Sequence, residues 1–376
     1  MTRENLLIVA DSERDANMLY AAGFLVPDPF IYLRIHGKPH LVLNDLEIDR
    51  ARRASRDCRL IRLSTYVRKL KREGIPAAGF ARVISAILRE RRLKKIVVPG
   101  NFPLGLAREL RALKIKVKAK DGDFFAEREI KTSEEVKKIN ASLIMAEVGL
   151  SEGIQALKNA KIGKNGRLFY HHVPLTSEKL RSIIEIAIMQ AGGLANHTIV
   201  ATGHQACDPH ERGYGPLRGN QPIILDVFPR SQKTGYFADI SRTVVKGRAS
   251  EAVRRIYATL ARAQDLAFAH LRDGRPTMEV HQIIEKFFKK EGFKTGRRNG
   301  KMEGFLHGAG HGLGLEIHEP PRINPTSEDF LRAGQVVTIE PGLYYPGLGG
   351  VRLEDVVLVT AKAPKNLTKF EKILEV

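Results

Sequence analysis

Short apolar runs alternate with amphipathic segments through the first third of the chain. The apolar runs predict strands over residues 6–10, 30–35, 40–43, 59–63, 95–98 and 115–118. Apolar positions at helical spacing predict helices over residues 11–22, 80–91 and 103–113. Gly37 and Lys38 lie between the second and third runs and predict the turn of a hairpin. Alternation of this kind is typical of an α/β domain with a mixed sheet.

The pattern changes between residues 124 and 136, where we expect a domain boundary after residue 128. Thr132 or Ser133 can cap a long helix whose apolar stripe follows the 3.6-residue period. Further helices are expected over residues 177–192, 250–272 and 277–292, and strands over 198–202, 336–340, 350–359 and 370–374. Residues 129–376 therefore repeat the order helix, helix, strands, which indicates an internal duplication. The whole chain is expected to be α/β (α+β) with domains 1–128 and 129–376.

One stretch, residues 305–321, places three histidines among evenly spaced glycines. The histidines are His307, His311 and His318, and glycine occupies positions 308, 310, 312 and 314. Two histidines four residues apart suggest a helical zinc motif, but four glycines disfavour a helix at about 1 kcal/mol each. An extended strand would also place His307 and His311 on one face. The opposite face of such a strand would carry no side chains and would admit another backbone, a metal or a substrate. The alternative interpretation of this stretch is a glycine-rich loop in which the histidines are incidental.

Four carboxylates lie in or beside apolar strands of the second domain. Asp226 lies inside the apolar run 222–228, and a hairpin is expected to place Asp239 opposite it. Glu340 and Glu354 lie in a second pair of strands, although spacing alone also permits Asp355 in place of Glu354. Buried carboxylates are costly and repel one another unless they are paired or bind cations.

Two divalent cations would relieve that repulsion. Four carboxylates with one imidazole, from His311, favour Mn, Co, Fe or Zn over a structural cysteine-based zinc site. Two such metals would share a water of lowered pKa aimed at a polarised carbonyl. Amide hydrolysis is therefore the expected reaction class.

Composition and charge narrow the remaining classes of function. The chain has 376 residues, a net charge of +20 and two cysteines, Cys58 and Cys207. No apolar run is long enough for a membrane span or a signal peptide, and two cysteines form no disulfide framework, so we expect a cytoplasmic protein. Residues 1–128 carry 27 Lys and Arg against 15 Asp and Glu, and the excess is densest over residues 50–72. Apolar residues interrupt that stretch, and no phosphate-binding loop or nucleic-acid motif accompanies it, so we do not expect nucleic acid as a partner despite the basic charge.

The ordered motifs resemble the pita-bread metallopeptidases, which include Xaa-Pro aminopeptidases, prolidases, methionine aminopeptidases and creatinases. The resemblance is carried by Asp226, Asp-Ile-Ser-Arg-Thr at 239–243, the His-Gly pattern at 307–319, Thr-Ile-Glu-Pro-Gly at 338–342 and Val-Arg-x-Glu-Asp at 351–355. The segment 198–210 and the preceding domain are similar to the proline-specific branch. This resemblance implies a creatinase-like domain over 1–128 and a pita-bread domain of two related halves over 129–376.

The resemblance also implies roles for individual residues. The implied ligands of two metal ions are Asp226, Asp239, His311, Glu340 and Glu354, with Asp239 bridging and Glu340 also acting as the base. His210, His318 and Arg352 are the other implied catalytic residues, and His307 lies on the substrate side. Taken singly, His210 is an ordinary surface histidine, His318 a turn residue and Arg352 a partner of Asp355. The remaining histidines, among them His197 and His281, are expected to be structural or exposed.

The implied activity is hydrolysis of the peptide bond before proline, by attack of a metal-bridging hydroxide. The partners would be small peptides with proline second, and a second copy in a homodimer. An arginine that binds a substrate carboxylate would distinguish a dipeptidase from an aminopeptidase, and Arg322, Arg332 and Arg352 are candidates. A hydrolase or lyase acting on a non-peptide substrate and a non-enzymatic binding protein are the alternatives. The sequence departs from the family at Asp226-Val-Phe, where members commonly have Asp-x-Gly, and over residues 203–210.

Overall fold

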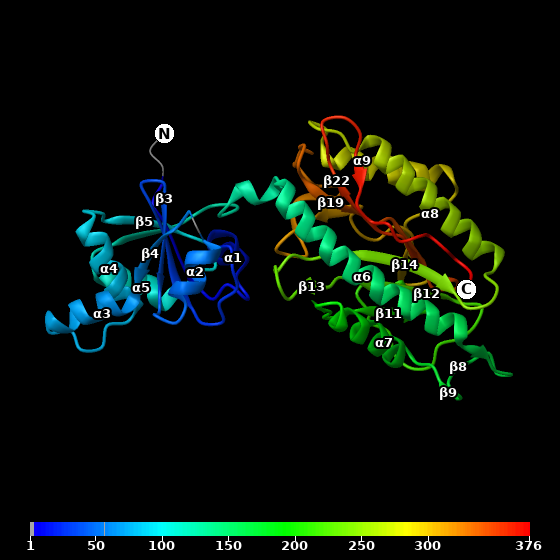
Figure 1. Ribbon diagram of the computed structural model, residues 1–376. Coiled ribbons are helices and arrows are strands. Elements are labelled where there is room, and N and C mark those ends of the chain that lie inside the picture. The colour runs from blue at the N-terminus through cyan, green and yellow to red at the C-terminus, as the bar shows by residue number, and fades with distance from the viewer. Residues whose placement is uncertain (1–3, 56) are drawn as a thin grey trace. The chain divides into compact units, whose positions relative to one another are not determined.

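A computed structural model describes residues 4–55 and 57–376 of the chain (Figure 1). Arg56, within the basic stretch 50–72, lies outside the described residues. The chain divides into two compact units, Met1–Arg128 and Glu129–Val376, and each is described by itself.

The first unit is built on a six-stranded mixed sheet in the order β4-β3-β2-β1-β5-β6. The strands are β1 (Leu6–Ala10), β2 (Phe30–Ile35), β3 (Lys38–Leu43), β4 (Arg59–Arg62), β5 (Lys95–Val98) and β6 (Lys116–Ala119). β2 pairs antiparallel with β1 and β3. The other three pairs, β3–β4, β1–β5 and β5–β6, are parallel. All six predicted strands are confirmed. The predicted hairpin is also confirmed, but its turn is at His36 and Gly37 and not at Gly37 and Lys38, because Lys38 already pairs with Ile35. Both turn residues have positive φ, as a tight hairpin turn requires.

Both faces of this sheet are covered because its strands alternate between two apolar sets. Leu7 and Val9 belong to one buried cluster, whereas Leu6 and Ile8 belong to another. The first cluster includes residues of α3 (Leu63–Arg72), α4 (Phe80–Glu90) and α5 (Leu104–Ala112), and the second includes residues of α1 (Ala16–Ala22) and α2 (Ile48–Ala54). The sequence pattern did not predict α2 and α3. α2 begins just before the basic stretch and buries only Ile48 and Ala51, which mark a short helical period. In α3, Leu63, Tyr66, Val67 and Leu70 do follow the helical period, so the sequence carried a signal for this helix.

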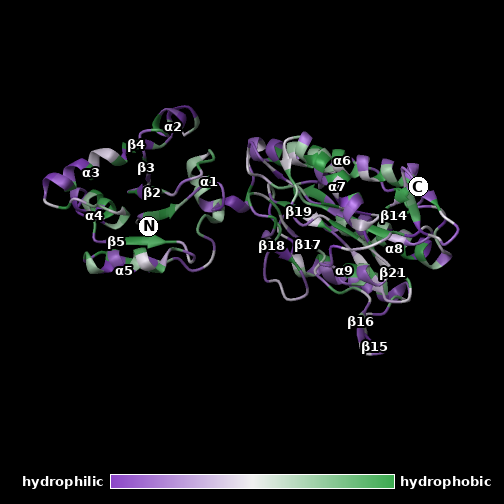
Figure 2. Cartoon of the chain, turned by 90° about the horizontal axis from the view of Figure 1, so that it is seen from below, coloured by the Kyte–Doolittle hydropathy of each residue, from purple (hydrophilic) through white to green (hydrophobic). Residues whose placement is uncertain are grey.

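The second unit begins with a long helix, α6 (Ser133–Asn159). Thr132 is its N-cap and forms a capping box with Glu135, in which side chain and backbone bond reciprocally. Ile139, Leu143 and Leu150 of the predicted stripe are buried. The other long helices of this unit are α7 (Ser177–Gln190), α8 (Glu251–His270) and α9 (Thr277–Lys290). Figure 2 shows hydrophobic and hydrophilic residues mixed along α6 and α7, as expected of helices that bury one face.

The longer strands of the second unit, among them β12, β14, β19 and β22, lie between the α6–α7 pair and the α8–α9 pair (Figure 1). The first half contributes a sheet of three strands, namely β11 (Ile199–Thr202), β12 (Pro222–Val227) and β14 (Ile240–Val245). The second half contributes a five-stranded sheet of β18 (Glu319–Ile323), β17 (Gly310–Gly312), β19 (Val336–Ile339), β22 (Asp355–Leu358) and β23 (Lys365–Asn366), and a hairpin of β20 (Gly342–Tyr345) and β21 (Gly349–Arg352). Short strands complete the unit, namely β7 (Lys161–Ile162), β8 (Leu168–Tyr170), β9 (Val173–Pro174), β10 (Gly193–Leu194), β13 (Arg230–Ser231), β15 (Gly296–Arg298) and β16 (Lys301–Glu303). The expected order helix, helix, strands therefore occurs twice.

Two predicted strands of this unit are wrong. The expected strand over 350–359 is split into β21 and β22, because the backbone between them changes partners and the N–H of Glu354 donates to the carbonyl of Ser241. The expected strand over 370–374 is absent. That segment instead lies along β14 through single contacts, such as the 2.6 Å hydrogen bond from the N–H of Val245 to the carbonyl of Leu374. Among the described residues, no helix is both long and apolar enough to cross a membrane.

Candidate active site

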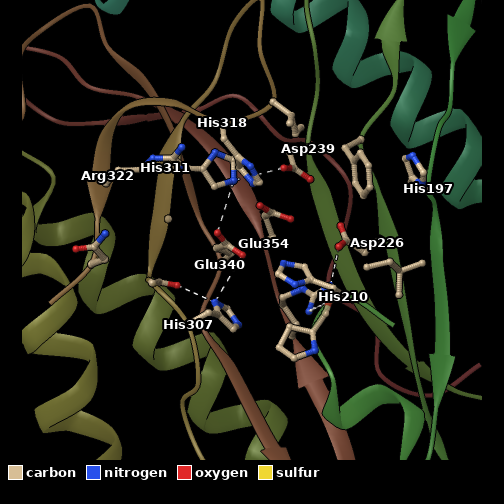
Figure 3. A pocket seen from close by; sticks show the side chains of 18 of the residues that line it. His197, His210, Asp226, Asp239, His307, His311, His318, Arg322, Glu340 and Glu354 are labelled. Atoms are coloured by element: carbon tan, nitrogen blue, oxygen red, sulfur yellow. Dashed lines mark hydrogen bonds and ion pairs between the residues drawn. The ribbon is translucent and has the colours of Figure 1, made fainter. Parts of the chain in front are cut away.

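All nine residues singled out from the sequence line one pocket of the second unit. The pocket has a volume of about 580 Å³ (Figure 3). The nine residues are His210, Asp226, Asp239, His307, His311, His318, Glu340, Arg352 and Glu354. His197 also lines the pocket. It is exposed, as expected, but no motif in the sequence predicted that it would lie here.

The first pair of carboxylates comes from β12 and from the residue that precedes β14. The two strands pair antiparallel with Asp226 opposite Ser241, so the expected direct opposition of Asp226 and Asp239 is wrong. Asp239 lies two residues before Ser241, a diagonal position on the same face of the ladder. Both carboxylates are buried, at 8% and 5% exposure, and both face the pocket.

The second pair comes from the residue that follows β19 and the residue that precedes β22. These strands pair antiparallel with Ile339 opposite Asp355, and continuing this register places Glu340 opposite Glu354. The hydrogen bond from the N–H of Glu354 to the carbonyl of Ser241 measures 3.0 Å and ties this pair to the first hairpin. The two halves of the unit thus each bring two carboxylates to one place.

His311 lies in the short strand β17, whereas His307 precedes the strand. The expectation of one continuous strand carrying both residues is therefore wrong, although both side chains reach Glu340. His311 Nε2 lies 3.6 Å from Glu340 Oε1, and His307 Nδ1 lies 3.8 Å from Glu340 Oε2. A Cβ on Gly310 would lie 2.0 Å from the carbonyl oxygen of Thr338, so the glycine admits a neighbouring backbone.

Asp239, His311 and Glu354 fit a metal ion. Their candidate ligand atoms all lie within 4.8 Å of one another, and all three residues are buried. Nδ1 of His311 faces the carbonyl of Gly312 at 3.1 Å, and because a carbonyl only accepts, that nitrogen carries the hydrogen. Nε2 is then left as a lone-pair donor, 3.6 Å from Asp239 Oδ2. That separation is too long for a hydrogen bond.

The electrostatics of the cluster also fit bound cations. Burial raises the pKa of Asp239, and the charge of Asp226 raises it further. Burial, followed by the neighbouring carboxylates, raises the pKa of Glu354, and burial raises the pKa of Glu340 to about 8. Burial lowers the pKa of His311 to about 3, which keeps the ring neutral and able to bind a metal. Bound divalent cations would attract these carboxylates, and this attraction would offset the repulsion and burial that make ionising them together unfavourable.

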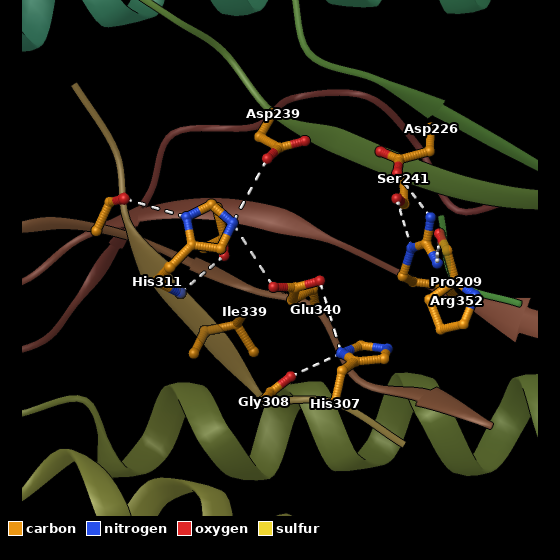
Figure 4. A network of polar contacts seen from close by, with 12 residues as sticks. Pro209, Asp226, Asp239, Ser241, His307, Gly308, His311, Ile339, Glu340 and Arg352 are labelled. Carbon is orange, nitrogen blue, oxygen red and sulfur yellow. Dashed lines mark hydrogen bonds and ion pairs between the residues drawn. The ribbon is translucent and has the colours of Figure 1, made fainter. Parts of the chain in front are cut away.

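Arg352 holds Asp226 from behind the cluster (Figure 4). Its Nη2 donates to Asp226 Oδ2 at 2.6 Å, its Nε to Ser241 Oγ at 3.0 Å and its Nη1 to the Tyr344 hydroxyl at 2.9 Å. Among the described residues, the other oxygen of Asp226, Oδ1, is buried without a hydrogen-bond partner. An unpartnered buried carboxylate oxygen beside the pocket is the second observation that fits a metal ion.

The alternatives left open for Asp355 are excluded by its position. Asp355 does not line the pocket and instead accepts from Arg242 Nη2 at 2.8 Å and from Lys372 Nζ at 2.9 Å. Arg352 pairs with Asp226 and not with Asp355. Glu354, which directly precedes β22, therefore faces the cluster, and Asp355 does not.

Tyr344 and Arg242 were not singled out from the sequence. Tyr344 is fully buried; its hydroxyl contacts Nε2 of His307 at 2.7 Å, and burial raises its pKa to about 12. Arg242 is 1% exposed and donates to the carbonyl of Glu354 at 2.6 Å. An arginine inside the apolar strand 240–245 was a signal, because a buried guanidinium requires partners.

His210 and His318 are exposed members of the pocket lining. His318 lies with its ring edge-on to His311, with centroids 4.4 Å apart and an interplanar angle of 87°. The backbone N–H of His210 donates to Asp208 Oδ1 at 3.0 Å, which fixes the loop that carries it. Both rings thus stand beside the carboxylate cluster without belonging to it (Figure 3).

The sequence of this chain is similar to that of known peptidases. Residues 137–361 match the sequence profile of metallopeptidase family M24. A Xaa-Pro dipeptidase of Pyrococcus furiosus is 35% identical over 178 residues, which cover 47% of this chain and 48% of that protein. The match to such curated relatives thus spans about half of their length.

Solved structures match over nearly the whole chain. The X-Pro aminopeptidase from Thermotoga maritima MSB8 has a TM-score of 0.83 at 22% identity, covering 99% of this chain and 97% of that one. The prolidase from Pyrococcus furiosus has a TM-score of 0.76 at 25% identity, covering 98% and 97%. The expected fold, an N-terminal α/β domain followed by a pita-bread domain, is confirmed.

Proposed function

The chain belongs to metallopeptidase family M24, and from that premise we propose that it hydrolyses the peptide bond before proline. The observation that carries the proposal is the gathering of four carboxylates, three histidines and one buried arginine around His311 in a single pocket. The residues that would hold two divalent cations are Asp226, Asp239, His311, Glu340 and Glu354. When bound, the cations would lower the pKa of a shared water and polarise the scissile carbonyl.

Glu340 is the proposed base. It is only partly buried and lies beside both His311 and His307, so a water in the pocket can reach its carboxylate. In the reaction Glu340 accepts the proton of the attacking water and passes it to the leaving prolyl nitrogen. That nitrogen must gain a proton as the C–N bond breaks, because it would otherwise leave as an amide anion, a very poor leaving group. The hydrogen bond between the Tyr344 hydroxyl and Nε2 of His307 holds the His307 ring beside Glu340.

His210 and His318 are proposed to bind the substrate carbonyl as it becomes tetrahedral. Both are exposed in the pocket and stand beside the carboxylates, where a ring N–H can donate to a developing oxyanion. Arg352 is proposed to orient Asp226 and not to contact substrate, since its nitrogens already donate to Asp226, Ser241 and Tyr344.

Arg322 is the proposed site for a substrate carboxylate. It is exposed, lines the pocket and lies opposite His311 in the β17–β18 ladder. Arg352 is committed to Asp226, and Arg332 lies outside the pocket lining and pairs with Glu129 at 3.2 Å. A free carboxylate on the proline of a dipeptide would meet Arg322, which favours dipeptides over longer peptides.

Three further parts of the proposal come from the resemblance and the cysteine usage. Manganese is the proposed metal, with cobalt, zinc or iron as substitutes at the same oxygen-rich ligands. A homodimer is the proposed assembly, and the cytoplasm the proposed compartment.

The test is hydrolysis of a Xaa-Pro dipeptide and a Xaa-Pro-Xaa tripeptide by the chain loaded with Mn²⁺ or Co²⁺. We expect cleavage of both, and faster cleavage of the dipeptide. In Arg322→Met the KM for the dipeptide should rise about 10-fold or more, the cost of one charged hydrogen bond, with a small change for the tripeptide. Arg332→Met is the matched control. No cleavage of either peptide would contradict the proposal.

A further inference from the structure

The carboxylate of Glu319 lies beneath the loop that joins β17 to β18, residues 313–318. Oε1 accepts hydrogen bonds from the backbone N–H of Leu315 at 2.9 Å and of Glu316 at 3.1 Å. Oε2 accepts from Nζ of Lys131 at 3.1 Å. The two side chains of this ion pair are 4% and 2% exposed. A buried ion pair persists where further hydrogen bonds satisfy it, and here the loop backbone supplies them.

Gly314 makes room for this carboxylate. A Cβ at Gly314 would lie 2.6 Å from Oε2 of Glu319, closer than real Cβ contacts come, and 3.0 Å from its Cδ, which is a tight contact. The carbonyl of Gly314 accepts a 2.8 Å hydrogen bond from the N–H of Phe237, which ties the loop to the segment before Asp239. The loop and the carboxylate thus fit together only where position 314 has no side chain.

Lys131 is itself fixed in place. Its backbone N–H donates to the carbonyl of Gly334 at 2.8 Å, and the next residue, Thr132, caps α6. Lys131 is not among the residues that line the pocket. Its ammonium group therefore acts as an anchor for the loop from outside the pocket.

The last residue of the loop is His318, directly before Glu319. We infer that the Lys131–Glu319 ion pair is a positioning device that holds the loop so that the His318 ring meets His311 edge-on. The inference depends on the proposed function, in which His318 binds the substrate carbonyl. Both ends of the loop are then fixed, by β17 at His311 and by the carboxylate at Glu319, and the ring orientation follows from them. Lys131 and Glu319 are positioning residues because they act through His318.

The first test uses the ring of His318 and needs neither metal nor substrate. Gly314→Ala pushes on the carboxylate without removing a charge, and Gly296→Ala, where a Cβ would meet no atom within 4 Å, is the matched control. With ¹³C-labelled histidine, we expect Gly314→Ala to shift the NMR signal that His318→Ala abolishes, and Gly296→Ala to leave it in place. Glu319→Gln is the second variant; it retains a carbonyl acceptor for the loop and leaves Lys131 without a charged partner, so the same signal should shift. An unmoved His318 signal in both folded variants would overturn the inference.

The second test is a double-mutant cycle on a Xaa-Pro dipeptide. Gly314→Ala should lower kcat/KM at least tenfold in the wild-type background and less than twofold when His318 is already alanine. Equal losses in both backgrounds would show a merely structural role and overturn the inference. Failure of the proposed function can be distinguished from failure of this inference. If the proposed function is wrong, the unaltered chain cleaves no Xaa-Pro peptide, whereas the NMR test still reports on the loop.

Discussion

Arg352 donates a 2.6 Å hydrogen bond from Nη2 to Oδ2 of Asp226, and this contact joins the two halves of the second unit. Asp226 comes from β12 in the first half and Arg352 from β21 in the second. The bond occupies one carboxylate oxygen from behind and leaves Oδ1 without a hydrogen-bond partner among the described residues. A carboxylate oriented in this way is prepared to bind a cation on its other side.

Replacement of Arg352 should therefore weaken metal binding. Lysine keeps the charge but cannot donate to Asp226, Ser241 and Tyr344 together. We expect Arg352→Lys to lose about 10- to 100-fold in Mn²⁺ affinity or in kcat/KM, the usual effect of removing a residue that orients a ligand. Metal titration by calorimetry measures the affinity. Arg332→Lys, outside the pocket lining, should match the wild type, and an unchanged affinity in Arg352→Lys would refute the role.

Removal of a proposed ligand should abolish activity without unfolding the chain. Asp226→Asn or His311→Ala should reduce peptide hydrolysis to the background rate, because each deletes one ligand of a shared cation pair. Circular dichroism should show folded proteins, and elemental analysis should show less than the wild-type metal content. The exposed Asp265→Asn, on α8 and outside the lining of the site, is the control. Near-normal metal-dependent turnover in either ligand variant would show that the ligand assignment is wrong.

Arg242 is predicted to stabilise the fold more than any exposed arginine. It is 1% exposed, pairs with Asp355 at 2.8 Å and donates to the carbonyls of Glu354 and Phe370, each at 2.6 Å. Removing one partner of a buried pair costs about 3–5 kcal/mol. Urea unfolding of Arg242→Met should show a loss of this size, whereas the exposed Arg248→Met should change stability by less than about 0.5 kcal/mol. Equal stabilities for the two variants would contradict the prediction.

The buried His281 should make the fold sensitive to acid. Burial lowers its pKa below the ordinary 6.5, against the nearby charge of Glu285, and its ring stacks on Phe305 with centroids 4.9 Å apart. Because the unfolded chain takes up a proton below about pH 6.5 and the folded chain does not, stability falls as pH drops below that value, by up to about 1.4 kcal/mol per unit.

His281→Phe removes this proton while keeping a ring for Phe305. The decrease in Tm between pH 7 and pH 5 should become smaller than in the wild type, as measured by thermal unfolding at both pH values. The exposed His204→Phe should leave the decrease unchanged. A wild-type pH dependence in His281→Phe would show that another group causes it.

The ligand residues could be predicted because each occupies a position that is unfavourable for its residue type unless it has a special role. Asp226 lies inside an apolar strand, and His311 lies among glycines that exclude a helix. Each of these residues could be recognised from the few residues around it, and the order of the motifs along the chain resembled that of a known family. All of the proposed ligands line one pocket.

What the sequence could not give was pairing across the chain. Asp226 lies opposite Ser241 and not Asp239, because register depends on the whole ladder and not on the two carboxylates. The break between β21 and β22 follows from a bond of Glu354 to Ser241, which belongs to another hairpin. Tyr344 showed no signal, because its role arises only where Arg352 and His307 meet its hydroxyl.

The most direct test of the account is the release of proline from a Xaa-Pro dipeptide as the metal-free chain is titrated with Mn²⁺. The account predicts no release without metal and a rate that rises to saturation near two bound ions per chain. A chain that binds two ions and releases no proline, or one that releases proline at the full rate without metal, would contradict it.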